Sequence, residues 1–269
     1  MSSNLSSSPD SKRMHGKCAG DKNSAFKRCR INEDVELLAE RLGGNEENIT
    51  YLTEDNLSWI IHIKQWMPTT SKEEFDKQWS LHPEDRHQLK LFGRMFTENR
   101  WSQSWGHSYS YSGSTNRARP IEESAMIQLL IDRANEVTRG LFASSENEKN
   151  PNRSSESEAK SELAQTKPYN GCLQNWYLIE DTIGLHADDE RDLQAQYPII
   201  SLTWGGTRRF VLKPRDKSLK KVEMYLEDGD LLLMGGLCQK THRHEVPKPR
   251  STMDPETSDR INWTIRAFR

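Results

Sequence analysis

The sequence predicts an α+β fold in which a β-sandwich or jelly roll forms the core and helices flank it in the first half of the chain. Two observations support this prediction. Residues 172–269 hold a series of short apolar segments separated by glycine-rich turns such as Gly205-Gly206. Residues 31–141 hold the stretches in which apolar residues recur at helical spacing.

The composition is typical of a folded domain with disordered segments. The 269 residues carry a net charge of -2, with 33% hydrophobic and 29% charged residues, and the charged fraction is high enough to favour disorder in places. The four cysteines lack Cys-x-x-Cys spacing, so we expect neither a zinc site nor a disulfide framework. No apolar run approaches the length of a membrane span, so we expect no membrane partner. We also expect a monomer.

Residues 1–30 are predicted to form a disordered basic tail before a folded domain at residues 31–269, because serine, lysine, arginine and glycine dominate them. Basic clusters lie at residues 12–13 and 27–30. The simpler interpretation is a solvated tail, and the alternative is a nuclear address or a phosphate contact. The serine-rich start has no hydrophobic segment, so we expect an intracellular protein of the nucleus or cytoplasm, with the basic clusters favouring the nucleus.

Helices and strands are expected to alternate in the first half of the domain. Ser71 and Glu74 have the spacing of a capping box, which opens a helix that runs through Trp79. Pro120 suits the first turn of a helix, where a backbone N–H has no partner within the helix. The expected elements are a helix at residues 31–42, a strand within 49–67, a helix at 72–79, a strand at 109–111 and a helix at 120–141.

Residues 144–168 interrupt this pattern. They consist mainly of Ser, Glu, Asn and Lys, and Leu163 is their only large apolar residue, so we predict a disordered insertion within the domain. Beyond the insertion, six strands are expected at residues 176–179, 199–204, 209–212, 222–226, 231–234 and 261–268.

A metal site is predicted from His186 and Asp188, which would share one face of a strand because they are two residues apart. Two imidazoles and one carboxylate can occupy one face of an octahedral metal and leave three positions open, as in non-haem Fe(II) oxygenases. The second imidazole comes from His242 or His244, and spacing does not decide between them. The acids at residues 189–190 are further candidate ligands, although a fourth protein ligand would leave fewer open positions.

Two arginines strengthen this hypothesis. His-x-Asp is a common pattern, and taken alone it is more simply explained as part of a charged surface loop. Arg260 and Arg266 follow the histidines and offer a fixed cation for an acidic cosubstrate. Three open metal positions accommodate a bidentate 2-oxo acid together with O2. The pattern therefore predicts Fe(II), a 2-oxo acid and an oxidation reaction.

These residues resemble the AlkB-like Fe(II)/2-oxoglutarate dioxygenases, which remove alkyl groups from nucleic-acid bases. The resemblance covers residues 91–269, apart from the insertion. Residues 260–266, Arg-Ile-Asn-Trp-Thr-Ile-Arg, are similar to the family's Arg-x-Asn-Leu-Thr-Phe-Arg signature. Residues 186–190, His-Ala-Asp-Asp-Glu, and residues 175–177, Asn-Trp-Tyr, resemble two further family motifs.

The resemblance implies a double-stranded β-helix (jelly roll) core, with flanking N-terminal helices and a nucleotide-recognition lid. It favours His244 over His242 as the third ligand, since the family ligand precedes an x-apolar-proline stretch. The implied metal ligands are His186, Asp188 and His244. The implied 2-oxoglutarate contacts are Asn175, Tyr177, Arg260, Asn262 and Arg266.

Residues 91–113 resemble the family's nucleotide-recognition lid, and we call these residues the lid segment. An enzyme that acts on a base must take it out of the stack and hold it between flat or apolar groups. The resemblance implies substrate contacts for six residues: Phe92, Arg100, Tyr109, Tyr111, Ser112 and Glu190. Tyr111 would stack on the base, Tyr109 would bond a phosphate or the base, and Arg100 would contact phosphate. Glu190 would accept from an exocyclic amine. A core position is the simpler interpretation of Phe92, and a duplex-inserting finger is the alternative.

The expected activity is oxidative demethylation of N-alkylated bases, of the 1-methyladenine or 3-methylcytosine type, in DNA or RNA. The products would be formaldehyde, succinate and CO2, and the role would be alkylation-damage repair or nucleic-acid demethylation. One alternative is a dioxygenase of the same fold that acts on a protein or a small molecule, which the lid segment disfavours. Another is a non-catalytic nucleic-acid-binding module, which the complete ligand and arginine set disfavours.

Overall fold

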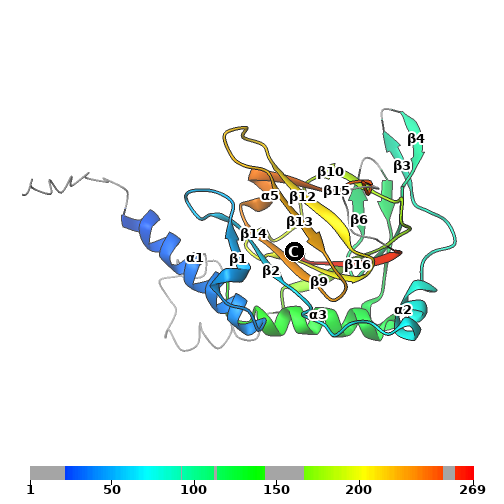
Figure 1. Cartoon of the computed structure of the whole chain (residues 1–269), viewed down its shortest axis with the longest axis horizontal. Coiled ribbons are helices and arrows are strands. Elements are labelled where there is room, and N and C mark those ends of the chain that lie inside the picture. Colours follow the sequence, from blue (N-terminus) through cyan, green and yellow to red (C-terminus); the bar gives the residue numbers. More distant parts are fainter. Residues whose placement is uncertain (1–21, 92, 112–113, 143–166, 251–257) are drawn as a thin grey trace, which may run out of the picture.

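The computed structural model describes residues 22–91, 93–111, 114–142, 167–250 and 258–269. Two β-sheets lie at its centre, and helices cover one face of the larger sheet (Figure 1). The larger sheet has the strand order β1-β2-β14-β11-β16-β9-β5-β8, and the smaller sheet has the order β10-β15-β12-β13. This sheet-rich α+β arrangement confirms the predicted fold class and is consistent with a jelly roll.

The helices of the described residues are α1 (Lys22–Arg41), α2 (Lys72–Trp79), α3 (Ala125–Val137) and α5 (Cys238–Thr241), with 3-10 turns at Glu46–Asn48 and Ile121–Glu123. The strands before the insertion are β1 (Ile49–Tyr51), β2 (Ser58–Ile63), β3 (Gln88–Leu91), β4 (Arg94–Thr97), β5 (Trp101–Trp105), β6 (Tyr109–Tyr111), β7 (Ser114–Asn116) and β8 (Ala118–Arg119). Those after it are β9 (Tyr169–Tyr177), β10 (Ile183–His186), β11 (Ile199–Gly205), β12 (Arg208–Pro214), β13 (Val222–Leu226), β14 (Leu231–Gly236), β15 (His242–Val246) and β16 (Arg260–Ala267).

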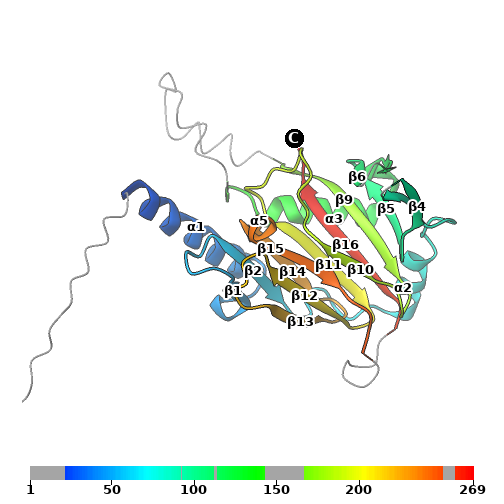
Figure 2. The ribbon, with the colours of Figure 1, turned by 90° about the horizontal axis from the view of Figure 1, so that it is seen from above.

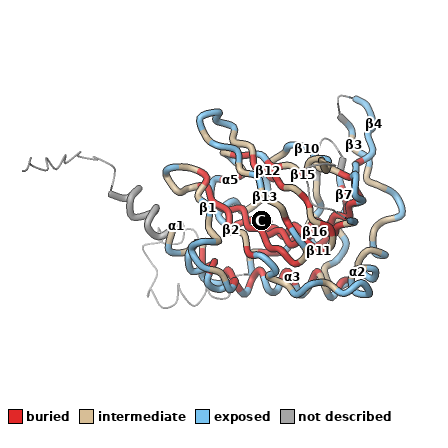
Figure 3. Tube along the Cα trace, in the orientation of Figure 1, coloured by how far each residue is buried: buried red, intermediate tan, exposed pale blue. Residues whose placement is uncertain are grey.

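Strand β16 separates the hydrophobic core from the pocket. Successive side chains of a strand point to opposite faces of its sheet. One set packs with α1 and α3 in the main core: Ile261, Trp263, Ile265 and Ala267. The other set lines a pocket between the two sheets: Arg260, Asn262, Thr264 and Arg266. Strands β9 and β11 run beside β16, and β14 lies on the other side of β11 (Figure 2). Buried positions concentrate along these central strands (Figure 3).

The expected capping box of α2 is confirmed. The Glu74 N–H donates to Ser71 Oγ at 3.2 Å, and the Ser71 N–H donates to the Glu74 carboxylate at 3.3 Å. Helix α3, in contrast, begins at Ala125 and not at Pro120 as predicted. Ser124 caps it by accepting from the Ile127 N–H, and the separate 3-10 turn takes the place of the predicted first turn.

Helix α1 begins at Lys22, inside the segment that was expected to be disordered. The predicted part is confirmed, because Val35, Leu38 and Leu42 are buried in the main core. An anchored turn removes the cost of helix nucleation, so residues on its N-terminal side can join the helix cheaply. The tail at residues 1–21 and most of the predicted insertion, residues 143–166, lie outside the described residues.

Five of the six strands expected after the insertion are present near their predicted bounds. Strand β9 overlaps the sixth, predicted at residues 176–179, only at residues 176–177, and it starts earlier than predicted. It begins at Tyr169 because its polar residues, among them Gln174 and Asn175, pair with β16 and β5 in the sheet interior. A search for runs of apolar residues misses a strand whose buried positions are partly polar. No helix within the described ranges is long and apolar enough to span a membrane.

Candidate metal and cosubstrate site

Strands β10 and β15 bring the two predicted histidine ligands together. His186 and His244 are direct partners in the antiparallel ladder, and their ring centroids are 4.2 Å apart. Asp188 completes the group, and the candidate ligand atoms of the three residues all lie within 4.8 Å of one another. The expectation that Asp188 shares a strand with His186 is wrong, because β10 ends at His186 and Asp188 lies in the loop beyond it.

Of the two candidate histidines, His244 is the one that converges with His186 and Asp188. His242 lies on the same face of β15 as His244, but its Nδ1 pairs with Thr241 Oγ1 at 2.8 Å and it is not part of the ligand group. Glu190 also lies outside the group, and its carboxylate pairs with Arg266 at 3.1 Å. The three residues that converge are therefore His186, Asp188 and His244.

The orientation of these side chains suits a metal. His186 Nδ1 lies 2.8 Å from the Gly184 carbonyl and donates to it, which leaves Nε2 as the free ligand atom. The Phe210 ring stacks on His244 at 5.4 Å between ring centroids. Asp188 is 3% exposed, and its Oδ2 has no hydrogen bond among the described residues. Two imidazole nitrogens and one carboxylate on one side of a site are the donor set that fits Fe(II).

The protonation states are also those that a metal requires. Burial and the neighbouring His186 lower the pKa of His244 to about 3. Burial, the largest single effect, would raise the pKa of Asp188, but the charges of Arg266, His244 and His186 together outweigh it, and the pKa falls to about 2. At neutral pH the imidazole is thus neutral and the carboxylate is ionised, so no proton has to leave before a metal binds.

Arg266 lies at the metal end of the pocket. Its Nη2 is 2.8 Å from Asp188 Oδ1, its Nη1 is 3.1 Å from Glu190 Oε1, and its guanidinium lies 5.4 Å from the Tyr109 ring centroid. Burial raises the pKa of Glu190, and Arg266 opposes this rise. Two carboxylates share one guanidinium here, and this arrangement favours a bound divalent cation.

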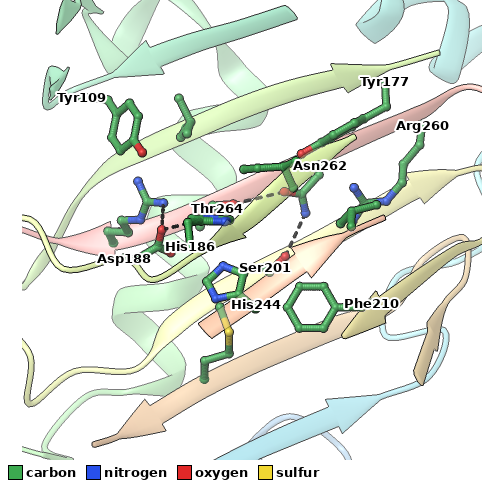
Figure 4. Close-up of a pocket in the computed structure, with 15 residues that line it drawn as sticks. Tyr109, Tyr177, His186, Asp188, Ser201, Phe210, His244, Arg260, Asn262 and Thr264 are labelled. Atoms are coloured by element: carbon green, nitrogen blue, oxygen red, sulfur yellow. Dashed lines mark hydrogen bonds and ion pairs between the residues drawn. The ribbon is translucent and has the colours of Figure 1, made fainter. Parts of the chain in front are cut away.

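Arg260 lies at the other end of the pocket, beside Tyr177 (Figure 4). The guanidinium is buried and lies 5.2 Å from the Tyr177 ring centroid, and its Nη2 donates to Thr203 Oγ1 at 3.0 Å. Its Nε and Nη1 have no hydrogen bond of normal geometry, and no described carboxylate forms an ion pair with it. Burial lowers the pKa of Arg260 to about 10. A buried cation without a counter-ion is costly, so this end of the pocket fits the distal carboxylate of a dicarboxylic cosubstrate.

The pocket between these two ends has a volume of about 480 Å³, including its open mouth. Four of the five predicted cosubstrate contacts line it, namely Tyr177, Arg260, Asn262 and Arg266. The Asn262 amide donates to Ser201 Oγ and to the Leu202 carbonyl, both at 2.8 Å. Asn175 lies opposite Asn262 in the sheet, but it is buried beside the pocket.

The predicted substrate contacts are only partly brought to the pocket. Tyr109, on strand β6, lines it together with the metal group. A phosphate contact would require Arg100 at the surface, but the residue is buried. It is 6% exposed, and its Nε donates to Asn175 Oδ1 at 2.7 Å. The Tyr111 side chain, Ser112 and Phe92 lie outside the described residues.

Sequence reasoning missed Phe210 and Gln239. Phe210 could have been found, because alternation along β12 places Phe210 and Leu212 on the inner face and Arg209 on the outer one. Gln239 accepts the Asp188 N–H at 3.0 Å. No sequence pattern predicts this contact, because the two residues are 51 positions apart in the chain.

Comparison with known proteins gives the following matches. A family model described as the 2OG-Fe(II) oxygenase superfamily matches residues 58–266. Alpha-ketoglutarate-dependent dioxygenase alkB homolog 3 of Bos taurus is 36% identical over 107 residues, which cover 36% of this chain and 36% of that protein. DNA oxidative demethylase ALKBH2 of Bos taurus is 33% identical over 112 residues, which cover 39% of each chain. The matches thus span little more than a third of these curated relatives.

A solved structure, "The structure of OsALKBH1", is 18% identical to the chain with a TM-score of 0.45, and it covers 81% of this chain and 99% of that one.

Proposed function

Because the chain belongs to the 2OG-Fe(II) oxygenase superfamily, we propose that it is a demethylase of N-alkylated bases in DNA or RNA. The proposed substrates are bases of the 1-methyladenine or 3-methylcytosine type. One relative, a DNA oxidative demethylase, supports this substrate class by its name, and the alkB homolog 3 relative is named an alpha-ketoglutarate-dependent dioxygenase. Each matches over little more than a third of its length.

The observation that carries the proposal is the position of Tyr109. This residue belongs to the lid segment, and it lines the same pocket as His186, Asp188 and His244. Tyr109 thus places an aromatic ring near the three candidate metal ligands, and it is carried by the antiparallel pair of strands β6 and β7. An aromatic ring beside a reactive centre suits a flat, extruded base, because stacking holds a base of any sequence context.

The residues divide the work along the pocket. His186, Asp188 and His244 would hold Fe(II), and Arg260 would bind the distal carboxylate of 2-oxoglutarate. When bound, Fe(II), 2-oxoglutarate and O2 supply the oxidation that inserts one oxygen atom into a C–H bond of the N-methyl group. Arg266 fixes the Asp188 carboxylate through its 2.8 Å ion pair. The N-hydroxymethyl product then loses formaldehyde, and the base regains its N–H or free ring nitrogen.

The proposal is tested by a substrate panel. Purified protein with Fe(II), 2-oxoglutarate and ascorbate is incubated with oligonucleotides that carry one 1-methyladenine or one 3-methylcytosine. Single-stranded DNA, duplex DNA and RNA are compared, and mass spectrometry follows the loss of the methyl group. We expect demethylation of at least one substrate by the parent protein and none by His186→Ala.

The other outcomes identify the alternatives. Turnover of 2-oxoglutarate to succinate without demethylation of any oligonucleotide would favour a protein or small-molecule substrate. Tight binding of oligonucleotides without any turnover would favour a non-catalytic binding module. Either result contradicts the proposal.

A further inference from the structure

Asp188 differs from the two histidines in how its backbone is held. His186 and His244 are paired in the β10–β15 ladder, whereas Asp188 lies past the end of β10, where no ladder partner is available. The Asp188 side chain is also pulled toward Arg266, whose Nη2 is 2.8 Å from Oδ1. A carboxylate on an unpaired loop could turn wholly toward that guanidinium and away from the imidazoles. Some other contact must therefore fix the loop.

Gln239 supplies this contact. Its side-chain carbonyl Oε1 accepts the Asp188 backbone N–H at 3.0 Å, and its Nε2 lies 3.6 Å from the sulfur of Met234. Met234 is buried and lines the pocket. The amide of Gln239 thus bridges the loop of the metal carboxylate to the inner face of the larger sheet.

The helix that carries Gln239 is itself firmly anchored. The Leu237 N–H, at the start of α5, donates to the Leu57 carbonyl at 2.7 Å. At the other end, Thr241 Oγ1 lies 2.9 Å from Ser58 Oγ, and Cys238 is buried between the two sheets. Helix α5 therefore holds the amide of Gln239 in a fixed place relative to β2 and β14.

We propose that Gln239 is a positioning residue of the metal centre, which acts by fixing the Asp188 backbone so that the carboxylate meets His186 and His244. The inference rests on the metal site of the proposed function and adds a residue to it. Groups that orient metal ligands through hydrogen bonds commonly affect metal affinity by 10- to 100-fold. Loss of the Gln239 acceptor should therefore weaken metal binding while the three ligands remain intact.

The test compares Gln239→Met, which keeps the length but loses the acceptor, with Gln239→Glu, which keeps an acceptor oxygen. Gln196→Met changes an exposed glutamine and is the control. The metal-free proteins are titrated with Mn(II), which is followed by electron paramagnetic resonance, and their thermal unfolding is recorded. The absorption spectrum of each Co(II) complex reports the ligand geometry.

We expect Gln239→Met to raise the Mn(II) dissociation constant about 10-fold and to alter the Co(II) spectrum. Gln239→Glu should stay within about 3-fold of the parent, as should Gln196→Met, and the metal-free melting temperatures should agree. Unchanged Mn(II) affinity in Gln239→Met would overturn the inference. So would weakened affinity in both variants at position 239 together with a lowered melting temperature, which would indicate a structural role only. A parent protein that fails to bind Mn(II) would instead contradict the metal site itself.

Discussion

Arg260 is the residue whose environment most clearly calls for a ligand. Arg260 is 2% exposed, and its guanidinium forms no ion pair with a described carboxylate. Arg208 is equally buried, but its guanidinium donates to the carbonyls of Leu178 and Asp181. Arg208 is thus satisfied by the fold itself. Arg260 instead keeps a buried positive charge that a bound anion would neutralise.

Replacing Arg260 should separate cosubstrate binding from folding. We expect Arg260→Met to raise the KM for 2-oxoglutarate about 100-fold, because a bidentate charge-assisted pair contributes ~3 kcal/mol. The stability of the ligand-free protein should be unchanged or higher, because an uncompensated buried charge is removed. Steady-state kinetics and urea unfolding measure the two effects.

The matched control is Arg208→Met, which should lower the free energy of unfolding by about 1–3 kcal/mol, because it removes the guanidinium donor from the buried Asp181 carbonyl and one of the two donors to the Leu178 carbonyl. If Arg260→Met destabilises the ligand-free protein as much as Arg208→Met does, then Arg260 is a structural arginine. The assignment of its pocket end to the cosubstrate would then be wrong.

At the scale of single elements, helix α1 offers a direct comparison between neighbouring leucines. Leu38 is fully buried in the main core, whereas Leu37 is 40% exposed. We expect Leu38→Ala to lower the free energy of unfolding by about 3 kcal/mol, and Leu37→Ala to change it by about 0.5 kcal/mol or less. Chemical denaturation of both variants measures this difference. Equal effects would mean that α1 does not pack on the sheet as described.

Local sequence was sufficient for elements whose signals are short in range. The capping box of α2 and five of the six strands after the insertion depend on residues that are close in the chain, and they were predicted correctly. The starts of α1 and α3 were not, because helix ends depend on anchoring and on which of several capping residues is used. Strand β9 was underestimated because two of its buried positions carry amide side chains, Gln174 and Asn175, in place of apolar ones.

At the scale of the whole molecule, the site exists because the large sheet has two unlike faces. One face packs against α1 and α3 through apolar side chains, and the other presents arginine, asparagine and threonine to the smaller sheet. The sequence could nominate most of the site residues by motif and by resemblance. It could not predict which groups surround Arg260 and Arg266 at the two ends of the pocket, or that Arg100 donates to Asn175. These contacts depend on the register between strands that are distant in the sequence.

We propose that one pocket couples oxidation of 2-oxoglutarate to removal of a methyl group from a base. The most direct measurement is the ratio of formaldehyde to succinate released with a 1-methyladenine oligonucleotide, in the parent protein and in Asp188→Ala. We predict about one formaldehyde per succinate in the parent, and neither product in Asp188→Ala, because the metal loses its carboxylate ligand. Succinate without formaldehyde in the parent, or undiminished turnover in Asp188→Ala, would contradict this coupling.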